Sequence, residues 1–200
     1  MKKFLLLIVS VFLITNVVNT VEYNSDPKIF ITELIDDAVK ILSDKSVTEE
    51  DKNKAIEKIA KKNVDIKAIG LYTLGNLRKT LEKEKLNEYQ ILFEKYFLKT
   101  LTSRLKDYSS QKFEVFNAEQ KSAKYTIVYS KITESSTQPE IKVNWRVYTK
   151  NPTKPLIRDL IVEGLSLAKV QKEEFASILN SNNNDINFLL NKLKEFVSNY

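Results

Sequence analysis

The 200-residue sequence contains no cysteine and no histidine. Without histidine the chain cannot form a Ser-His-Asp or Cys-His nucleophile pair, and without either residue it cannot bind zinc through nitrogen or sulfur ligands. Disulfide bonds and a lipid anchor on cysteine are excluded for the same reason. We therefore expect no metal site and no cofactor.

Glycine and proline are also scarce, with three and four residues respectively. These low numbers argue against glycine-rich phosphate loops, collagen-like tracts and long flexible linkers. The 32 basic residues outnumber the 26 acidic ones, but no arginine-rich cluster accompanies this excess. The charge balance therefore suggests neither nucleic-acid binding nor a strong polybasic membrane patch.

The first twenty residues predict an export signal. Lys2 and Lys3 form a basic start, and an apolar run from Phe4 to Ile14 is broken only by Ser10. This run is shorter than the roughly 20 apolar residues that a membrane span needs. We expect residues 1–20 to be a signal peptide and residues 21–200 to form a single exported domain. The alternative is an uncleaved amphitropic anchor.

Apolar residues recur at helical spacing near both ends of the chain. Asp26 and Pro27 form a helix start, because a capping side chain precedes a proline in the first turn. The pattern from Leu86 to Tyr108 is the longest and is unusually aromatic. The predicted helices run from Asp26 to about Leu42, from Thr48 to about Ala60, from Asp65 to about Gly75, from about Leu86 to Tyr108, from about Ala168 to Leu179 and from about Asp185 to Val197.

The period changes in the middle of the chain, where β-branched and aromatic runs alternate with polar or proline-containing turns. These runs predict four strands over Phe113–Phe116, Tyr125–Ile132, Ile141–Tyr148 and Leu156–Leu167. The third alternates most clearly, so one face of the sheet should meet the helices. We predict an α+β fold in which N-terminal and C-terminal helices pack on one side of a curved four-stranded antiparallel sheet.

No arrangement of carboxylates indicates catalysis. Neighbouring acids such as Asp36 and Asp37 point about 100 degrees apart on a helix, so they cannot face each other, and solvated helix surface is the simpler interpretation. Asp159 and Glu163 are more unusual because they interrupt the last apolar run. One of them could be a buried acid, whereas an exposed face or an ion pair with Arg146 on the adjoining strand is the commoner outcome. We predict no catalytic residues and no enzyme.

Four segments of the chain resemble a known family in order and spacing. The segment RDLIVEGLSLAKVQKEEF, Arg158 to Phe175, resembles the D-(x)4-G-(V/I)-S-L region, followed by an aromatic residue, of the MlaC family of periplasmic phospholipid-binding proteins. These proteins are also called toluene-tolerance auxiliary components of an ABC transport system. The segments VDIKAIGLYTLG (Val64–Gly75), EYQILFEKYFLKTLTSRLKDY (Glu88–Tyr108) and VNWRVY (Val143–Tyr148) are similar to three further family segments.

The resemblance implies a periplasmic phospholipid carrier that shuttles lipids between the outer and inner membranes. It implies three partners, namely phospholipid, the MCE-domain protein of an inner-membrane ABC transporter, and an outer-membrane lipoprotein complex, and it implies no nucleic acid. A soluble carrier must offer an apolar cavity for the acyl tails, since their burial contributes about 25 cal/mol per Å².

The same resemblance suggests which side chains line such a tail cavity, although each could equally be plain core. They are Phe93, Phe97, Leu101, Val143, Trp145, Val147, Leu165 and Leu167. A sheet that encloses a cavity usually needs bulges or glycine, and we expect Gly164 to mark a bend.

Basic residues on or beside the outward side of the predicted strands are candidates for docking the membrane complexes, although ordinary solubilising charges are an equal explanation for each. They are Lys142, Arg146, Lys150, Lys154 and Arg158. Two other functions stay open, namely an exported interaction module of the cell envelope without a ligand, and an enzyme on a related α+β scaffold.

Overall fold

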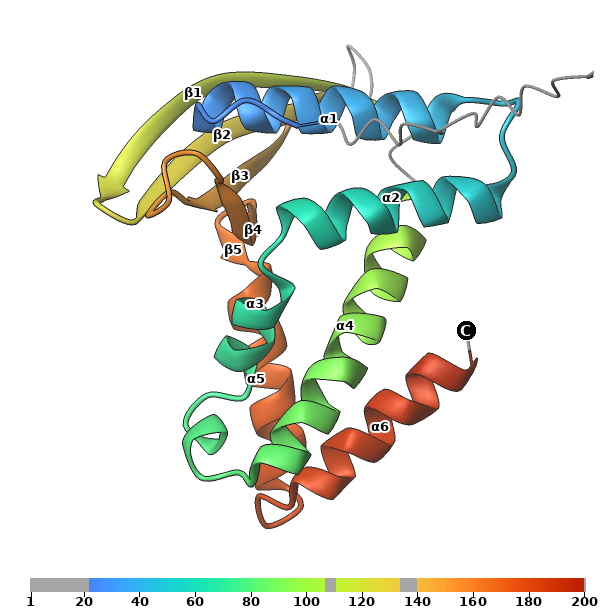
Figure 1. Cartoon of the computed structure of the whole chain (residues 1–200), viewed down its shortest axis with the longest axis vertical. Coiled ribbons are helices and arrows are strands. Elements are labelled where there is room, and N and C mark those ends of the chain that lie inside the picture. Colours follow the sequence, from blue (N-terminus) through green and yellow to red (C-terminus); the bar gives the residue numbers. More distant parts are fainter. Residues whose placement is uncertain (1–21, 107–110, 134–139, 200) are drawn as a thin grey trace, which may run out of the picture.

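The computed structural model describes residues 22–106, 111–133 and 140–199 (Figure 1). The predicted export signal, residues 1–20, lies outside these residues. The predicted helix end at Tyr108 and the polar turn at 135–139 also lie outside them. None of the helices in the described ranges is both long and apolar enough to span a membrane.

Helices precede and follow a run of strands, so the predicted α+β class is confirmed. The helices are α1 (Pro27–Ser43), α2 (Glu49–Asn63), α3 (Ile66–Thr73), α4 (Lys83–Leu105), α5 (Leu167–Asn180) and α6 (Ile186–Asn199), with a short 3-10 helix η1 (Leu77–Lys79) before α4. The strands are β1 (Lys112–Ser122), β2 (Tyr125–Thr133), β3 (Ile141–Tyr148), β4 (Leu156–Val162) and β5 (Leu165–Ser166). Consecutive strands pair antiparallel, in the order β1-β2-β3-β4-β5.

The predicted number of strands was wrong, because the described residues form five strands and not four. The run predicted from Leu156 to Leu167 is divided where Glu163 and Gly164 adopt positive φ angles of 48° and 84°. These angles reverse the chain, so that Leu165 pairs with Val162. Gly164 therefore lies in a tight turn that ends β4, and not in a bend within one continuous strand as predicted. The left-handed conformation of a glutamate is uncommon and has no signal in the hydrophobic pattern.

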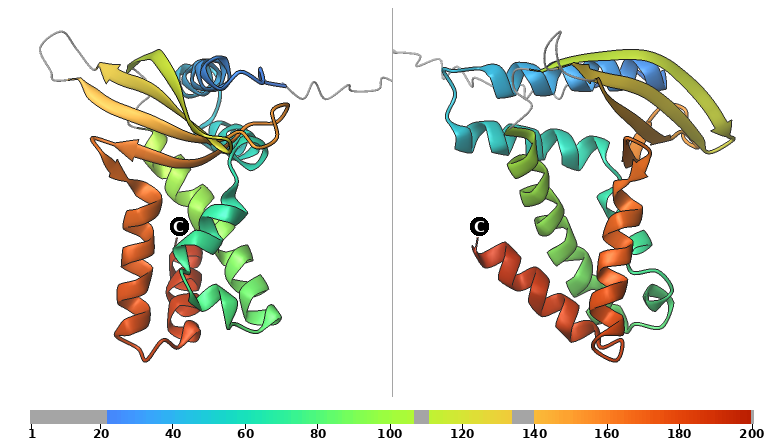
Figure 2. Two further views of the ribbon diagram at one scale, coloured as in Figure 1. Left: turned by 90° about the vertical axis from the view of Figure 1, so that its left-hand side faces the viewer. Right: turned by 180° about the vertical axis from the view of Figure 1, so that it is seen from behind.

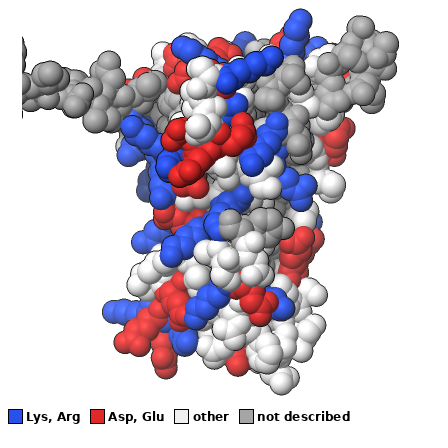
Figure 3. Space-filling view, turned by 90° about the vertical axis from the view of Figure 1, so that its right-hand side faces the viewer, with Lys and Arg blue, Asp and Glu red and all other residues white. Residues whose placement is uncertain are grey.

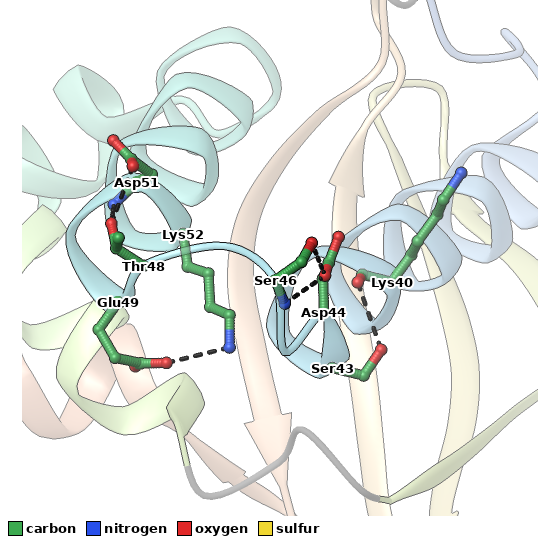
Figure 4. Close-up of polar contacts among 8 residues, drawn as sticks. All are labelled: Lys40, Ser43, Asp44, Ser46, Thr48, Glu49, Asp51 and Lys52. Carbon is green, nitrogen blue, oxygen red and sulfur yellow. Dashed lines mark hydrogen bonds and ion pairs between the residues drawn. The ribbon is translucent and has the colours of Figure 1, made fainter.

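Side-chain caps fix the start of the first two helices. Asp26 accepts hydrogen bonds from the backbone N–H groups of Lys28 and Ile29 at 2.9 and 3.0 Å, directly ahead of α1. The chain then turns back at Asp44, whose carboxylate accepts hydrogen bonds from the side chain and the backbone of Ser46 (Figure 4). Those two bonds lower the pKa of Asp44. Thr48 caps α2, as its sequence position predicts, by accepting from the backbone N–H of Asp51 at 3.2 Å.

Helix α1 lies along one face of the sheet (Figures 1 and 2). Apolar side chains of α1, including Phe30 and Ile31, form one core with Val128, Val147 and Ile157 from the three central strands. The alternating face of β3 therefore meets a helix, as predicted. Register shifts between Val115 and Asn117 and between Arg146 and Val147 interrupt the pairing, and such bulges bend a sheet.

Helices α3, α4, α5 and α6 extend away from the sheet and enclose a second core (Figures 1 and 2). The aromatic stripe of α4 lies here, where the Tyr89 ring stacks on Phe93 and meets Phe175 edge-on. Gly70 lets α3 pack closely against α4, because a Cβ at this position would lie 2.8 Å from the ring of Phe93 on α4. Burial raises the pKa of Tyr89, whose hydroxyl lies 2.7 Å from Thr73 Oγ1.

Candidate functional site

A buried aspartate joins the last two strands to α5. The carboxylate of Asp159 is 1% exposed and lies 3.4 Å from the guanidinium of Arg146 on β3. It also accepts hydrogen bonds from Ser166 Oγ at 2.6 Å and from the backbone N–H of Ala168 at 3.0 Å. Ser166 in turn caps α5 by accepting from the N–H of Lys169. Asp159 is thus both a buried acid and the ion-pair partner of Arg146, which unites the two outcomes that the sequence left open.

A second aspartate fixes α3 against the sheet. Asp65 caps α3 by accepting from the N–H of Ala68, and its own N–H donates to the carbonyl of Ile157 on β4. Its Oδ2 accepts from Nε and Nη2 of Arg158 at 2.8 and 2.7 Å. Residues far apart in the sequence therefore hold α3 beside β4.

Arg158 is the extra residue of a bulge in β4, since Arg146 pairs with Asp159 while Val147 pairs with Ile157. Its guanidinium carbon lies 3.5 Å from the centre of the Tyr148 ring, and Nη1 donates to the Tyr125 hydroxyl at 3.0 Å. Burial alone would lower the pKa of Arg158, but the hydrogen bonds to Tyr125 and Asp65 outweigh burial and raise it. The side chain is therefore a fixed cation.

A hollow of about 660 Å³ lies between the sheet and α3, on the sheet face opposite to α1. Its apolar lining comes from α3, β2, β4 and the start of α5. These residues are Ala68, Ile69, Ile127, Ile161 and Ala168. The volume is within the range of about 300–1,000 Å³ that is usual for small-molecule sites.

The rest of the lining is aromatic or cationic. Tyr72, Tyr125 and Tyr129 contribute rings, and Arg146 and Arg158 contribute guanidinium groups. Of the described residues that line the hollow, three are basic and none is acidic. The site therefore combines an apolar wall with positive charge, which suits a ligand that has an apolar part and an anionic part.

The structure places the eight predicted tail-cavity residues in different parts of the molecule, and none of them lines the hollow. Phe93 is buried among the helices with Phe97 and Leu101 beside it. Val147 is buried under α1 with Trp145 beside it, and Val143 is buried on the same strand. Leu165 and Leu167 are 65% and 47% exposed. Their role in holding acyl tails stays a prediction.

The sequence did not predict the residues that line the hollow. The alternation of β3 placed the predicted cavity on its apolar face, whereas the hollow is lined by Asn144 and Arg146 from the opposite face. A signal was nevertheless present in β2, where Tyr125, Ile127 and Tyr129 alternate with Thr126, Val128 and Ser130. The face that carries Tyr125, Ile127 and Tyr129 is aromatic and apolar, which is unusual for a strand face left in solvent and indicates that this face is covered.

The sequence matches the family model described as MlaC protein over residues 32–195. The chain belongs to the MlaC family. Of the four segments that resemble this family, three contribute residues to the hollow or to the two aspartate contacts beside it. In this MlaC-family chain, most of the segments that resemble the family therefore lie around the hollow. No cluster of three or more acidic side chains in the described ranges could hold a metal ion there.

Among solved structures, the MlaC-family chain is similar to the phospholipid-binding protein from Ralstonia solanacearum, which was solved in complex with a phospholipid. The TM-score is 0.69 at 16% sequence identity, and the match covers 84% of this chain and 95% of that chain. At this identity the likeness shows a shared fold. No curated protein matches the sequence.

Proposed function

We propose that this MlaC-family chain is a periplasmic phospholipid carrier that holds acyl tails in the apolar part of the hollow and shuttles lipid between the outer and inner membranes. The observation that carries the proposal is the hollow itself, which is bounded by family segments in a fold shared with a phospholipid-bound protein. Ile69, Ile127 and Ile161 supply the apolar wall. Burial of tail surface at about 25 cal/mol per Å² would dominate the affinity.

The proposed partners are an MCE-domain protein of an inner-membrane ABC transporter and an outer-membrane lipoprotein complex. Of the basic residues expected to dock them, Arg146 and Arg158 line the hollow, whereas Lys142, Lys150 and Lys154 are exposed. Basic and acidic side chains are interspersed on the face in Figure 3, so that face shows no continuous basic patch. Because Arg146 and Arg158 line the hollow, the three exposed lysines are the better candidates for docking.

Raised ionic strength is expected to leave bound phospholipid largely in place while it slows transfer to a reconstituted MCE-type acceptor. Tail burial is apolar and insensitive to screening, whereas attraction between exposed charges fades beyond about 8 to 10 Å at physiological salt. The measurement is lipid retained and lipid transferred, each at low and high salt. Loss of most bound lipid at high salt would contradict tail burial, and transfer independent of salt would contradict electrostatic docking.

A further inference from the structure

We infer that Arg146 binds the phosphodiester group of the lipid inside the hollow, an inference that rests on the proposed function and specifies which part of the ligand meets charge. The apolar wall and the guanidinium group belong to the same hollow, so one amphiphilic ligand with an anionic head can contact both.

Arg146 has hydrogen-bonding capacity that its protein contacts do not use. A guanidinium carries five N–H donors, yet the only polar contact of this side chain with the described residues is Nη1 to Asp159 at 3.4 Å. Its side chain is 43% exposed. Asp159 already accepts two shorter hydrogen bonds, from Ser166 and Ala168, so it does not depend on Arg146 alone.

Arg158 differs from Arg146 in this respect. Three of its N–H groups are directed to Asp65 and Tyr125, and its guanidinium carbon lies over the Tyr148 ring. This arrangement makes Arg158 a structural cation that holds α3 and β4 together. It also prepares a donor for the ligand, because the Tyr125 hydroxyl accepts from Arg158 and keeps its own hydrogen.

The carboxylates of Asp65 and Glu119, near the hollow, are already paired with basic side chains. Asp65 is paired with Arg158, and Glu119 is paired with Lys121 and accepts from the Tyr129 hydroxyl. Asn144, on the same face of β3 as Arg146, is neutral. A phosphodiester that enters the hollow therefore meets a cation with free donors and no lining carboxylate among the described residues.

The experiment compares two lipids that share their tails, dioctanoyl phosphatidylglycerol and dioctanoylglycerol, which lacks phosphate. Arg146→Gln is expected to weaken binding of the phosphatidylglycerol about tenfold, the loss typical of a charge-assisted hydrogen bond, and to leave binding of dioctanoylglycerol unchanged. Lys112→Gln is the matched control, since Lys112 is an exposed basic residue on β1 of the same sheet and does not line the hollow. It should change neither affinity.

A second variant tests the inference independently, in case Arg146→Gln does not fold. Asn144→Asp leaves the residues Arg146 and Asp159 in place, is nearly isosteric and puts a negative charge in the hollow. It should also weaken phosphatidylglycerol selectively. Equal losses for both lipids in both variants, or no loss for either lipid, would overturn the inference. Failure of the unaltered protein to bind either lipid would instead overturn the proposed function.

Inorganic phosphate is the third probe, because the same guanidinium chemistry would bind a free anion. We expect inorganic phosphate to bind far more weakly than the phosphatidylglycerol, since it makes no contact with the apolar wall. If it binds as tightly as the lipid, the site serves free phosphate and the assignment to a lipid phosphodiester is wrong.

Discussion

Ile127→Trp should lower the amount of phospholipid bound per folded protein about tenfold or more, while the chain stays folded. Ile127 lies on β2 with its side chain in the hollow, and it is half-buried, so a larger ring there occupies the space proposed for acyl tails. Tryptophan is well accepted in strands, which favours folding of the variant. The measurement is phospholipid per folded protein, determined by quantitative mass spectrometry.

Two further tryptophan substitutions are needed, one as a control and one as a test of the other placement of the tails. Ile91→Trp makes the same exchange on α4, where Ile91 is 51% exposed and lies outside the hollow, and it should not change lipid content. Leu165→Trp tests the placement predicted from the sequence. If Leu165→Trp empties the protein and Ile127→Trp does not, the tails lie by the predicted residues and not in the hollow.

Asp159→Ala should lower the free energy of unfolding by about 3 kcal/mol, near the low end for breaking a buried ion pair because Arg146 is partly exposed. Removal of the carboxylate leaves the buried N–H of Ala168 and the hydroxyl of Ser166 without their acceptor. Urea unfolding measures the loss.

Asp159→Asn should be less harmful than Asp159→Ala, since its amide oxygen can still accept one of the two hydrogen bonds. Asp44→Ala is the control, because Asp44 is exposed in the turn between α1 and α2, and its removal should cost much less. Similar losses for Asp159→Ala and Asp44→Ala would show that Asp159 does not join the strands to α5.

Local signals predicted much of the fold. Three features depend only on residues close together in the sequence and could therefore be predicted from it. They are the cap at Thr48, the helix start at Asp26–Pro27 and the alternation of β3. The division of the last strand was not predictable in this way, because it depends on positive φ at Glu163, which the tertiary structure imposes.

The hollow could not be predicted from periodicity for a related reason. The apolar face of β3 suggested a cavity, but side chains of α1 such as Phe30 and Ile31 fill the space against it. The opposite face carries Asn144 and Arg146 and resembles a solvated surface in sequence. It becomes the wall of a hollow because contacts between distant residues, such as Asp65 and Arg158, which are 93 positions apart, hold α3 beside it.

The central claim, that the chain binds phospholipid, is tested most directly by organic-solvent extraction of the folded protein, purified from cells in which it has met membranes, followed by mass spectrometry of the extract. We expect phospholipid at close to one molecule per protein, with a range of head groups because the tails dominate binding. An extract without phospholipid, from protein shown to be folded, would contradict the account and favour an interaction module without a ligand.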